Sequence, residues 1–581
     1  MVLLGWRGHP RGFGRAGKMN TVEQQVTAEL DRLAADEPLS CRARHLARLS
    51  GGRFDVLVIG GGITGAGIAL DAVARGLSVA LVEAGDFASG TSSRSSKMIH
   101  GGFRYLQTGD VALVRESLRE RHALQRNAPH LVRVMPFMIP LFLKGGVINP
   151  KLSRALGGAL WSYQLAGAWR LGRRHRRLSH DEVARHMPSL DMARIGAGYM
   201  FHDLRADDAR LVLAVLASAA TRGACVVNHA RCVGLSDCRK GIRTARIAVD
   251  GEETDVSARM VVNATGVWAQ KFLEAVSVHS PRKLAPAKGT HIVVPHALVR
   301  NDVAVSLPVA SDRRTVSVVD EGPFAYIGST ETTDPADVDK PSVTENDISY
   351  ILDGINRHLV RPVTPSDIIS GWAGFRPLIA DGKSARSSDL SRRHSIEQEA
   401  DRLITVTGGK LTTYREMAEG TVDVICQVLD HKARCTTRKL RLHGYHAGAS
   451  HLARGERLDK RYGDRAAAVQ RLSRLAPELG TTITPNGDTT LAEAVWGLRA
   501  EMATTLVDAL FRRTRIATFD GRAVLADAAG IAMRVGRAVG WGANRIGAEI
   551  ALLDSTLRQE LGVLALDLPQ PPHTHSREDT P

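Results

Sequence analysis

The stretch FDVLVIGGGITGAGIAL, residues 54–70, decides the fold class, because an apolar strand leads through a glycine turn into an alanine-rich helix. Gly60, Gly62 and Gly65 have the spacing G-x-G-x-x-G, which allows a tight turn, close approach of the backbone to a pyrophosphate, and helix-on-strand packing. The start of the helix directs unpaired N–H groups toward that anion. A second strand, LSVALVE, ends in Glu83, 23 residues after Gly60, where the acid that binds ribose hydroxyls is expected. The pattern predicts a dinucleotide site; a structural glycine turn in another α/β fold is the alternative.

The polar loop SSRSSKMIHGGFRYLQ, residues 92–107, favours FAD over NAD as that dinucleotide. It joins hydroxyls and cations to a Gly-Gly pair and contains no acid, whereas an NAD fold would continue with a regular alternation of strands and helices. Such a loop suits a long cofactor that needs hydroxyl and amide partners along its length. An apolar strand ending in NATG, and the strand, double glycine and helix of LITVTGGKLTTYREMAEG, offer further backbone amides to the cofactor.

The chain resembles the FAD-dependent, respiratory glycerol-3-phosphate dehydrogenases in the order of its motifs. The matching blocks are VIGGGITGAGIALDA, GTSSRSSKMIHGGFRYL, VNATGVWA, KGTHIVVP, YIGSTET, GFRPL, SRRH and TGGKLTTYREMAE. These blocks span about residues 54–419, and AVWGLRAEMATTLVDALFRRTR resembles the helical C-terminal domain of the family. Two features depart from the family pattern. SRRH carries Arg393 where the family more often has Asp or Asn, and the N-terminal leader matches no part of the family.

The resemblance implies an α/β (α+β) fold with a Rossmann-like FAD-binding domain of the glutathione-reductase and D-amino-acid-oxidase type. An antiparallel-sheet substrate domain, to which the alternating runs TVSVVD and FAYIGST are assigned, and a helical C-terminal domain complete it. The expected ranges are a partly disordered leader at 1–45, an oxidoreductase region at 50–430, a helical domain at 435–565 and a disordered tail at 566–581. Within the oxidoreductase region, FAD-binding segments are expected at about 50–105, 190–285 and 365–430, and substrate segments at about 106–189 and 286–364.

The resemblance also implies an activity, the oxidation of sn-glycerol 3-phosphate to dihydroxyacetone phosphate by hydride transfer to noncovalent FAD, with a membrane quinone as the electron acceptor. Oxidising a secondary alcohol requires its C–H hydrogen to lie against the flavin and a base to take the hydroxyl proton, so orientation is most of the task. The dianionic phosphate is a handle away from the reacting carbon, and arginine meets phosphate oxygens bidentately. The catalytic residues implied by the resemblance are Arg104, Arg376, Lys410, His291 and Tyr105.

A larger set of residues is predicted to bind the cofactor, from the glycine motif, the polar loop and the resemblance together. The set is Gly60, Gly62, Gly65, Glu83, Thr91, Ser92, Ser95, Ser96, Lys97, His100, Gly101, Ala264, Thr265, Gly266, Arg376, Gly409, Lys410, Leu411 and Thr412. His291 and Lys410 are the leading candidates for the base, with Tyr105 and His100 behind them, because histidine titrates near neutral pH. A buried structural histidine is the alternative for His291. The six cysteines show no CxxC pair and no zinc-site spacing, so no metal is expected.

The formal net charge of +16 indicates attraction to an anion, whether nucleic acid, lipid surface or phosphorylated metabolite. Between Glu120 and Asp181 there is no acidic residue, and LSRALGGALWSYQLAGAWRLGRRHRR joins tryptophans to a basic end, as an interfacial membrane helix does. A buried helix followed by a solvated basic loop is the alternative. The run VMPFMIPLFL at 134–143 is far shorter than the roughly 20 residues of a spanning helix. We therefore expect a cytoplasmic protein held peripherally at the inner face of the cell membrane, with a homodimer as one assembly that the sequence allows.

Three other functions compete with this interpretation. A glycerol-3-phosphate oxidase would pass the electrons to oxygen and release peroxide. An FAD-dependent tRNA-modifying enzyme would use the basic charge for RNA, but aromatic residues make up 5% of the chain and give little stacking surface, so we expect no nucleic-acid partner. A non-catalytic flavoprotein scaffold at the membrane would bind FAD that no sugar phosphate reduces.

Overall fold

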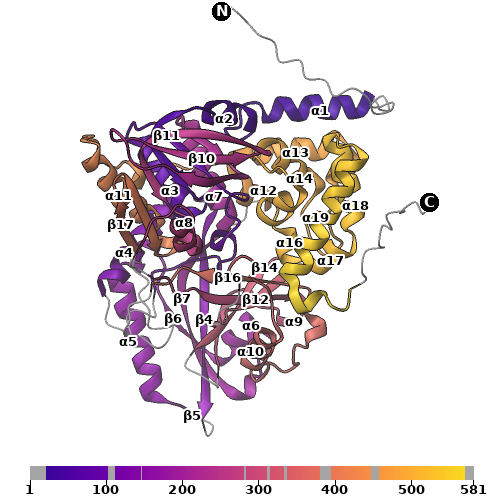
Figure 1. Ribbon diagram of the computed structural model, residues 1–581. Coiled ribbons are helices and arrows are strands. Elements are labelled where there is room, and N and C mark those ends of the chain that lie inside the picture. Colours follow the sequence, from indigo (N-terminus) through magenta and orange to yellow (C-terminus); the bar gives the residue numbers. More distant parts are fainter. Residues whose placement is uncertain are drawn as a thin grey trace, which may run out of the picture.

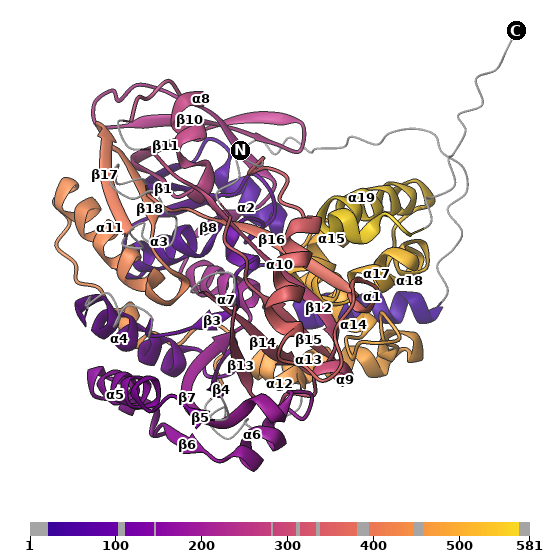
Figure 2. The same cartoon turned by 90° about the horizontal axis from the view of Figure 1, so that it is seen from below.

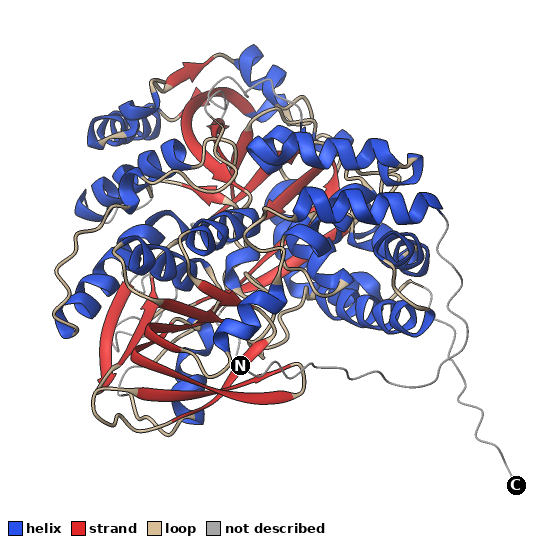
Figure 3. Ribbon diagram, turned by 90° about the horizontal axis from the view of Figure 1, so that it is seen from above, coloured by secondary structure: helices blue, strands red, loops and turns tan. Residues whose placement is uncertain are grey.

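The computed structural model describes residues 21–102, 111–144, 147–280, 283–309, 314–332, 337–379, 394–446 and 457–568. Two β-sheets form the body of the molecule, and a helical cap packs beside them (Figure 1). Figure 3 shows the cap helices in blue on one side of the strands. Among the described residues, no helix has both the length and the apolar character needed to span a membrane.

The first sheet carries the glycine turn predicted from the sequence. Its strand order is β17 (His394–Ala400), β18 (Leu403–Gly408), β11 (Glu252–Asn263), β1 (Arg53–Ile59), β2 (Val79–Val82) and β8 (Cys225–Val227), with β10 (Arg243–Val249) and β9 (Ala230–Leu235) extending from β11. From β18 to β8 the neighbouring strands are parallel. One face is covered by α3 (Ile63–Ala74), α7 (Asp208–Thr221) and α11 (Tyr414–Val428), which share one apolar core with the strands. The continuous apolar run in β1 is what a parallel sheet covered on both faces requires, and the Rossmann-like prediction is confirmed.

The second sheet is mostly antiparallel and forms the substrate domain. Its order is β16 (Ser370–Arg376), β12 (Ala287–Pro295), β15 (Phe324–Gly328), β14 (Thr315–Glu321), β13 (Ala304–Pro308), β4 (Val132–Lys144), β7 (Ile195–Ala206) and β3 (Met98–Ile99), with β5 (Val147–Ile148) on β4 and β6 (Arg176–Leu178) on β7. The runs predicted as antiparallel strands are β14 and β15, which pair antiparallel. The apolar run at 134–143 lies within β4.

Two predicted domain boundaries are wrong. Strand β7 was assigned to the FAD-binding segment 190–285, and β16 to the segment 365–430, yet both lie in the second sheet. The reason is pairing, because β7 runs beside β4 along almost its whole length and β16 pairs with β12. The chain therefore crosses between the two sheets more often than the motif order indicates.

Helices surround the two sheets. Beside the substrate sheet are α4 (Val111–Asn127), α5 (Pro150–Ala166), α6 (His180–His186), α9 (His296–Val299) and α10 (Glu345–Asn356). Helix α8 (Ala269–Ala275) packs on the first sheet instead. The cap contains α12 (Arg457–Tyr462), α13 (Ala466–Leu475), α14 (Leu491–Ala500), α15 (Leu506–Asp508), α16 (Ile516–Phe519), α17 (Gly521–Ala526), α18 (Ala528–Val539) and α19 (Ala543–Leu561). In Figure 2, seen from below, α4 and α5 lie side by side at the outer edge, away from the cap. The helical C-terminal domain of the sequence prediction is thus confirmed.

The predicted leader is helical where the structure describes it. Helix α1 (Thr21–Ala34) crosses from the FAD-binding side to the cap, and α2 (Arg42–Leu49) packs against β8 (Figure 1). Leu30 and Ala34 are buried in the same apolar core as the cap helices, and Leu49 is buried under the first sheet. The leader is therefore ordered from residue 21 onward, because apolar burial offsets the entropy of ordering these helices. Residues 1–20 and 569–581 lie outside the described part of the chain.

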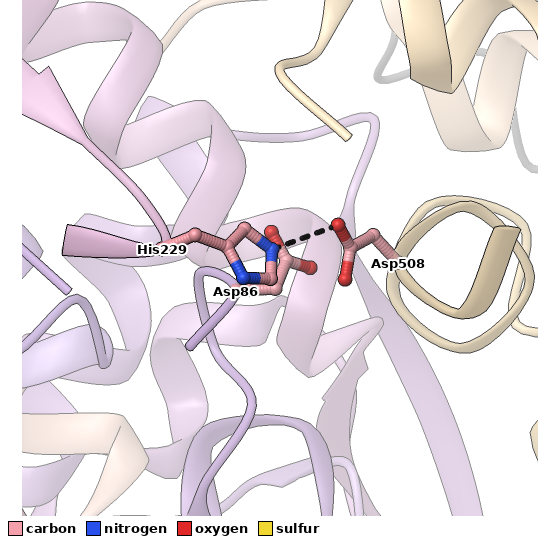
Figure 4. Close-up of side chains that lie close together, drawn as sticks. All are labelled: Asp86, His229 and Asp508. Carbon is pink, nitrogen blue, oxygen red and sulfur yellow. Dashed lines mark hydrogen bonds and ion pairs between the residues drawn. The ribbon is translucent and has the colours of Figure 1, made fainter. Parts of the chain in front are cut away.

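Buried ion pairs fasten the cap to the loop that follows β2. Asp86 accepts hydrogen bonds from Arg513 at 2.5 and 2.9 Å and from Arg512 at 2.5 Å. The ring of His229 lies close to Asp86, and its Nε2 is 3.0 Å from the carboxylate of the cap residue Asp508 (Figure 4). Three such side chains could ligate a metal, but guanidinium groups already meet both carboxylates and offset the charge that a cation would need. The cluster is therefore an anchor made of ion pairs.

Candidate active site

The glycine turn between β1 and α3 has the geometry of a pyrophosphate cradle. Gly60 has a φ of +114°, and a side chain there would come within 2.5 Å of the Ala264 carbonyl oxygen. A side chain on Gly65 would collide with the Gly60 carbonyl, so both positions require glycine. A side chain on Gly62 would meet only the Ser92 hydroxyl, at 3.1 Å, so Gly62 keeps open the space before the helix N-terminus. These are the separate roles that the sequence pattern assigned to the three glycines.

Glu83 lies at the end of β2 beside this turn. Its carboxylate accepts hydrogen bonds from the backbone N–H of Gly61, at 2.6 Å, and of Gly85, at 2.8 Å. Burial raises the pKa of Glu83, and the two N–H groups lower it. An acid fixed next to the glycine turn is what ribose hydroxyls need as an acceptor. The cradle and the acid together fit an adenine dinucleotide such as FAD.

The polar loop after β2 is held by the protein at several of the predicted cofactor residues. The Thr91 hydroxyl donates to the Phe375 carbonyl at 2.6 Å, and the Ser92 hydroxyl accepts from the Ile63 N–H at 2.9 Å. Ser92 therefore lies at the first turn of α3, where a cofactor phosphate is expected. Thr91 ties the loop to β16 and so joins the two sheets.

Ser95 and Lys97 bind a different partner from the one predicted. The Ser95 hydroxyl donates to the Asp208 carboxylate at 2.7 Å, and the Lys97 amine lies 3.6 Å from the same carboxylate. Both side chains therefore face the start of α7 and do not reach toward the glycine turn. The sequence counted hydroxyls and cations in this loop without showing which of them meet a buried acid. Their part in binding the cofactor stays a prediction.

Two other strand ends supply backbone to the site. After β11, the Asn263 side chain accepts from the Thr265 hydroxyl at 2.7 Å, and Gly266 has a φ of +63°, so the turn that carries Ala264 is fixed from within. After β18, Gly409 has a φ of +82° and is followed by the short 3₁₀ helix Leu411–Thr413. Helix α11 then begins at Tyr414, so the predicted order of strand, double glycine and helix is observed.

Lys410 and Thr412 meet the far end of the polar loop. The Thr412 hydroxyl accepts from the His100 N–H at 3.2 Å and lies 3.3 Å from the His100 carbonyl oxygen. The Lys410 amine lies 3.5 Å from the Ser117 hydroxyl of α4. The structure therefore joins Thr412 to His100 and places the Lys410 amine against α4.

His291 and Arg376 lie on one face of the substrate sheet. In the β12–β16 ladder, Ala287 pairs with Arg376 and His291 pairs with Trp372, so these side chains point to the same side. The Arg376 guanidinium lies over Gly289, where a side chain would come within 2.7 Å of it, and it donates to the Ser329 hydroxyl at 3.0 Å. Two strands therefore deliver a histidine and a guanidinium side by side.

The His291 ring is held by its neighbours on this face. It stacks on Trp372, with the ring centres 4.7 Å apart and the planes at 12°, and its Nε2 is 3.0 Å from the Ser96 hydroxyl. Its Nδ1 is buried and has no hydrogen-bond partner within the described ranges. Burial, then the charges of Lys97 and Arg376, hold the pKa of His291 well below its ordinary value. The imidazole is therefore neutral and can accept a proton.

The comparisons with known proteins agree with this geometry. Residues 55–419 match the family described as FAD dependent oxidoreductase, and residues 435–546 match the C-terminal domain of alpha-glycerophosphate oxidase. Glycerol-3-phosphate dehydrogenase 2 of Mycobacterium tuberculosis is 37% identical, over 88% of this chain and 89% of that protein. The chain belongs to the FAD-dependent glycerol-3-phosphate dehydrogenase family. The family resemblance seen in the motifs is thereby confirmed.

Two further members of this dehydrogenase family extend the comparison. The glycerol-3-phosphate dehydrogenase of Mycobacterium leprae is 36% identical over 90% of this chain and 91% of that protein. The crystal structure of the glycerol-3-phosphate dehydrogenase of Bacillus halodurans, complexed with FAD, superimposes with a TM-score of 0.72 at 28% identity, covering 90% of this chain and 98% of that one. FAD is the cofactor, as predicted.

Some predicted residues of the dehydrogenase lie outside the described part of the chain, and Gly101 is packed closely against two helices. Arg104, Tyr105 and Arg393 are in the first group. A side chain on Gly101 would collide with Leu118 and Tyr163, so this glycine makes room for α4 and α5. Its N–H donates to the Tyr163 hydroxyl at 2.8 Å.

Sequence reasoning missed several residues of the site, although one signal could have found them. In GWAGFRPL, Gly374 lies two positions from both Trp372 and Arg376, and in KGTHIVVP, Gly289 lies two positions before His291. In a strand, residues two positions apart share one face, and the glycine leaves open space on it. That reading would have added Trp372 and Gly289 to His291 and Arg376. No local pattern indicates Asp208, because its partners in the polar loop lie more than a hundred residues earlier.

Proposed function

We propose that this protein oxidises sn-glycerol 3-phosphate to dihydroxyacetone phosphate and passes the electrons to a membrane quinone. The relatives that cover nine tenths of the chain are named glycerol-3-phosphate dehydrogenases. The observation that carries the proposal is the shared face of β12 and β16, on which a neutral histidine and an arginine lie side by side. That face meets the polar loop, because Ser96 bonds His291 and a side chain on Gly374 would come within 2.6 Å of Arg94.

The two side chains suit the two ends of the substrate. Arg376 would bind the phosphate, because its planar guanidinium keeps its charge and matches phosphate oxygens. His291 would take the proton of the C2 hydroxyl at Nδ1, which requires the tautomer in which Nε2–H donates to the Ser96 oxygen. FAD, when bound, supplies the acceptor for the C2 hydrogen and its two electrons.

Further cations and a dry site would complete the binding of the dianion. Lys410 is a further candidate cation, and family resemblance adds Arg104 and Tyr105. His291 and Trp372 are almost wholly buried, so water is excluded from this part of the face. In such surroundings each charge-assisted contact contributes about 1.5 to 3 kcal/mol.

The membrane part of the proposal rests on α5 and the turn after it. Trp161, Leu165 and Trp169 are 55%, 76% and 59% exposed, although large apolar side chains are usually covered. Trp161 and Leu165 are four residues apart in α5 and share one stripe of the helix, and Trp169 follows in the 3₁₀ turn Ala168–Leu171. Basic residues surround them, namely Lys151, Arg154, Arg170, Arg173, Arg174, Arg176 and Arg177. An apolar stripe within a basic field is the pattern of a helix that lies on an anionic lipid surface.

An anaerobic titration tests the substrate. The yellow absorbance of the bound FAD should bleach on addition of sn-glycerol 3-phosphate and remain with sn-glycerol 1-phosphate, which has the opposite configuration. Retention of the absorbance with intact FAD would reject the proposal in favour of a scaffold.

The electron acceptor needs its own test, because residues 435–546 match a domain described from an oxidase. The reduced protein is mixed either with air or with a soluble quinone, and the rates of flavin reoxidation are compared. We expect fast reoxidation by quinone with little peroxide. Stoichiometric peroxide with slow quinone reduction would identify an oxidase instead.

Vesicle binding tests the surface. The protein should sediment with vesicles that contain phosphatidylglycerol, and less with neutral vesicles. Trp161→Ser combined with Trp169→Ser should reduce the bound fraction, whereas Val360→Ser, a control at another apolar residue, 71% exposed and outside this stripe, should not. Equal binding by all three proteins would refute α5 as the contact.

A further inference from the structure

Lys97 is a buried cation for which the proposed chemistry has no role so far. Its amine lies 4.3 Å from the ring centre of Trp372 and 5.7 Å from that of the cap residue Phe519. The side chain is 3% exposed, and within the described residues the amine has no hydrogen-bond partner, although the Asp208 carboxylate is 3.6 Å away. Burying an amine is unfavourable, so a residue needed only to fill this space would be apolar. A buried ionisable group beside an active site is a functional candidate.

Two routes connect Lys97 to His291. Ser96, the residue before it, bonds Nε2 of His291 at 3.0 Å. The Lys97 amine lies over the Trp372 ring, and this ring stacks on the His291 ring with the ring centres 4.7 Å apart. Ser96 therefore contacts His291 directly, and Lys97 acts on His291 through the Trp372 ring.

The charges around these two groups favour a neutral histidine. His291 faces the cations Lys97 and Arg376, and both lower its pKa in addition to the effect of burial. Lys97 lies near the acids Asp208 and Asp207 and near Arg515 of the cap, which itself pairs with both acids. Burial lowers the pKa of Lys97 to about 7, while Asp208 opposes that shift. A proton on His291 would thus place a new positive charge near a cation that is already poorly solvated.

We propose that Lys97 is a positioning residue, which through the Trp372 ring keeps His291 oriented and neutral so that Nδ1 can accept the hydroxyl proton of the substrate. The inference rests on the proposed function of His291 as the base. In the step itself, one proton moves from the substrate hydroxyl to Nδ1, and the C2 hydrogen leaves with two electrons to FAD. Lys97 gains and loses nothing in this step, and its effect lies in the charge that it places near the histidine.

The test compares Lys97→Met with a matched lysine substitution. The anaerobic rate of flavin reduction by glycerol 3-phosphate is measured against pH. Without the charge of Lys97, the acidic limb of the profile should move to higher pH, while the alkaline plateau and the FAD content stay close to those of the parent. Lys240→Met is the control, because Lys240 also has a left-handed backbone, with φ of +51° against +58° for Lys97, but has an exposed side chain. Its profile should match the parent.

Each other outcome has a defined meaning. An acidic limb that stays in place in Lys97→Met overturns the inference. His291→Asn should abolish the limb, and a limb that survives this change also overturns it, because another group then titrates. If Lys97→Met loses FAD, Lys97→Gln provides a second uncharged variant, for which the same shift is expected. A parent protein that glycerol 3-phosphate does not bleach at any pH refutes the proposed function itself and is thus distinguishable.

Discussion

Replacing Arg376 with glutamine tests how the substrate is held. The guanidinium lies over Gly289, beside His291 on the same face of the sheet, and donates to Ser329 at 3.0 Å. One charge-assisted contact contributes about 1.5 to 3 kcal/mol, and about 1.4 kcal/mol corresponds to a factor of ten in affinity. Arg376→Gln should therefore weaken the binding of glycerol 3-phosphate by roughly 10- to 150-fold. The loss should appear in the dissociation constant, because the guanidinium binds the end of the substrate that does not react.

Stopped-flow flavin reduction under anaerobic conditions separates binding from chemistry. The concentration dependence gives a dissociation constant, and the plateau gives the rate of reduction. Glycerol serves as the matched substrate that lacks the phosphate, so Arg376→Gln should change its poor reaction little. Arg361→Gln, at a side chain that is 74% exposed, is the control for losing one positive charge.

Two results would refute this reasoning. An unchanged dissociation constant for glycerol 3-phosphate would show that Arg376 does not bind the phosphate. Equal losses with glycerol and with glycerol 3-phosphate would show that Arg376 acts on the reacting centre or on the fold.

Three further predictions concern the cofactor cradle and the cap. Gly65→Ala should abolish FAD binding, measured as flavin absorbance per protein, because its methyl group collides with the Gly60 carbonyl. Asp86→Ala should lower the free energy of unfolding by about 3 to 5 kcal/mol in denaturant titrations, because buried Arg513 loses its carboxylate partner and Arg512 keeps only Asp508. Burial lowers the pKa of His229, but Asp508 raises it more, so the net shift is upward. The stability from this pair is therefore fully present below the ordinary histidine pKa of about 6.5 and is lost as the pH rises through the raised value. His229→Asn should remove that loss from thermal unfolding midpoints measured across neutral pH.

Much of the fold was readable because its signals are local. The glycine turn, the acid at the end of β2 and the alternating strands β14 and β15 each follow from fewer than 30 consecutive residues. The placement of β7 and β16 was not readable, since it depends on which distant strand each one joins. The sequence also did not predict helices α1 and α2. Their apolar residues are covered by distant parts of the chain, namely the cap and the first sheet.

The candidate site also contains residues with a local sequence signal and residues whose contacts depend on distant parts of the chain. His291 and Arg376 were found through their motifs, and the ladder of β12 and β16 explains why these motifs meet. Ser95 and Lys97 were assigned to the cofactor, because the sequence shows that the loop is polar and positively charged. It does not show which group each of these side chains contacts. Asp208 supplied that partner from the start of α7.

The anchor between the cap and the polar loop has a consequence for how the protein is made. Asp86 is joined to Arg512 and Arg513 at sequence separations of 426 and 427, and Arg94 to Glu560 at a separation of 466. During translation, the loop that contains Asp86 and Arg94 therefore cannot form these ion pairs until the end of the chain has been synthesised. Contacts of such large sequence separation also form slowly. Stable loading of the flavin then follows release from the ribosome, and nascent chains stopped before the cap should hold the cofactor poorly.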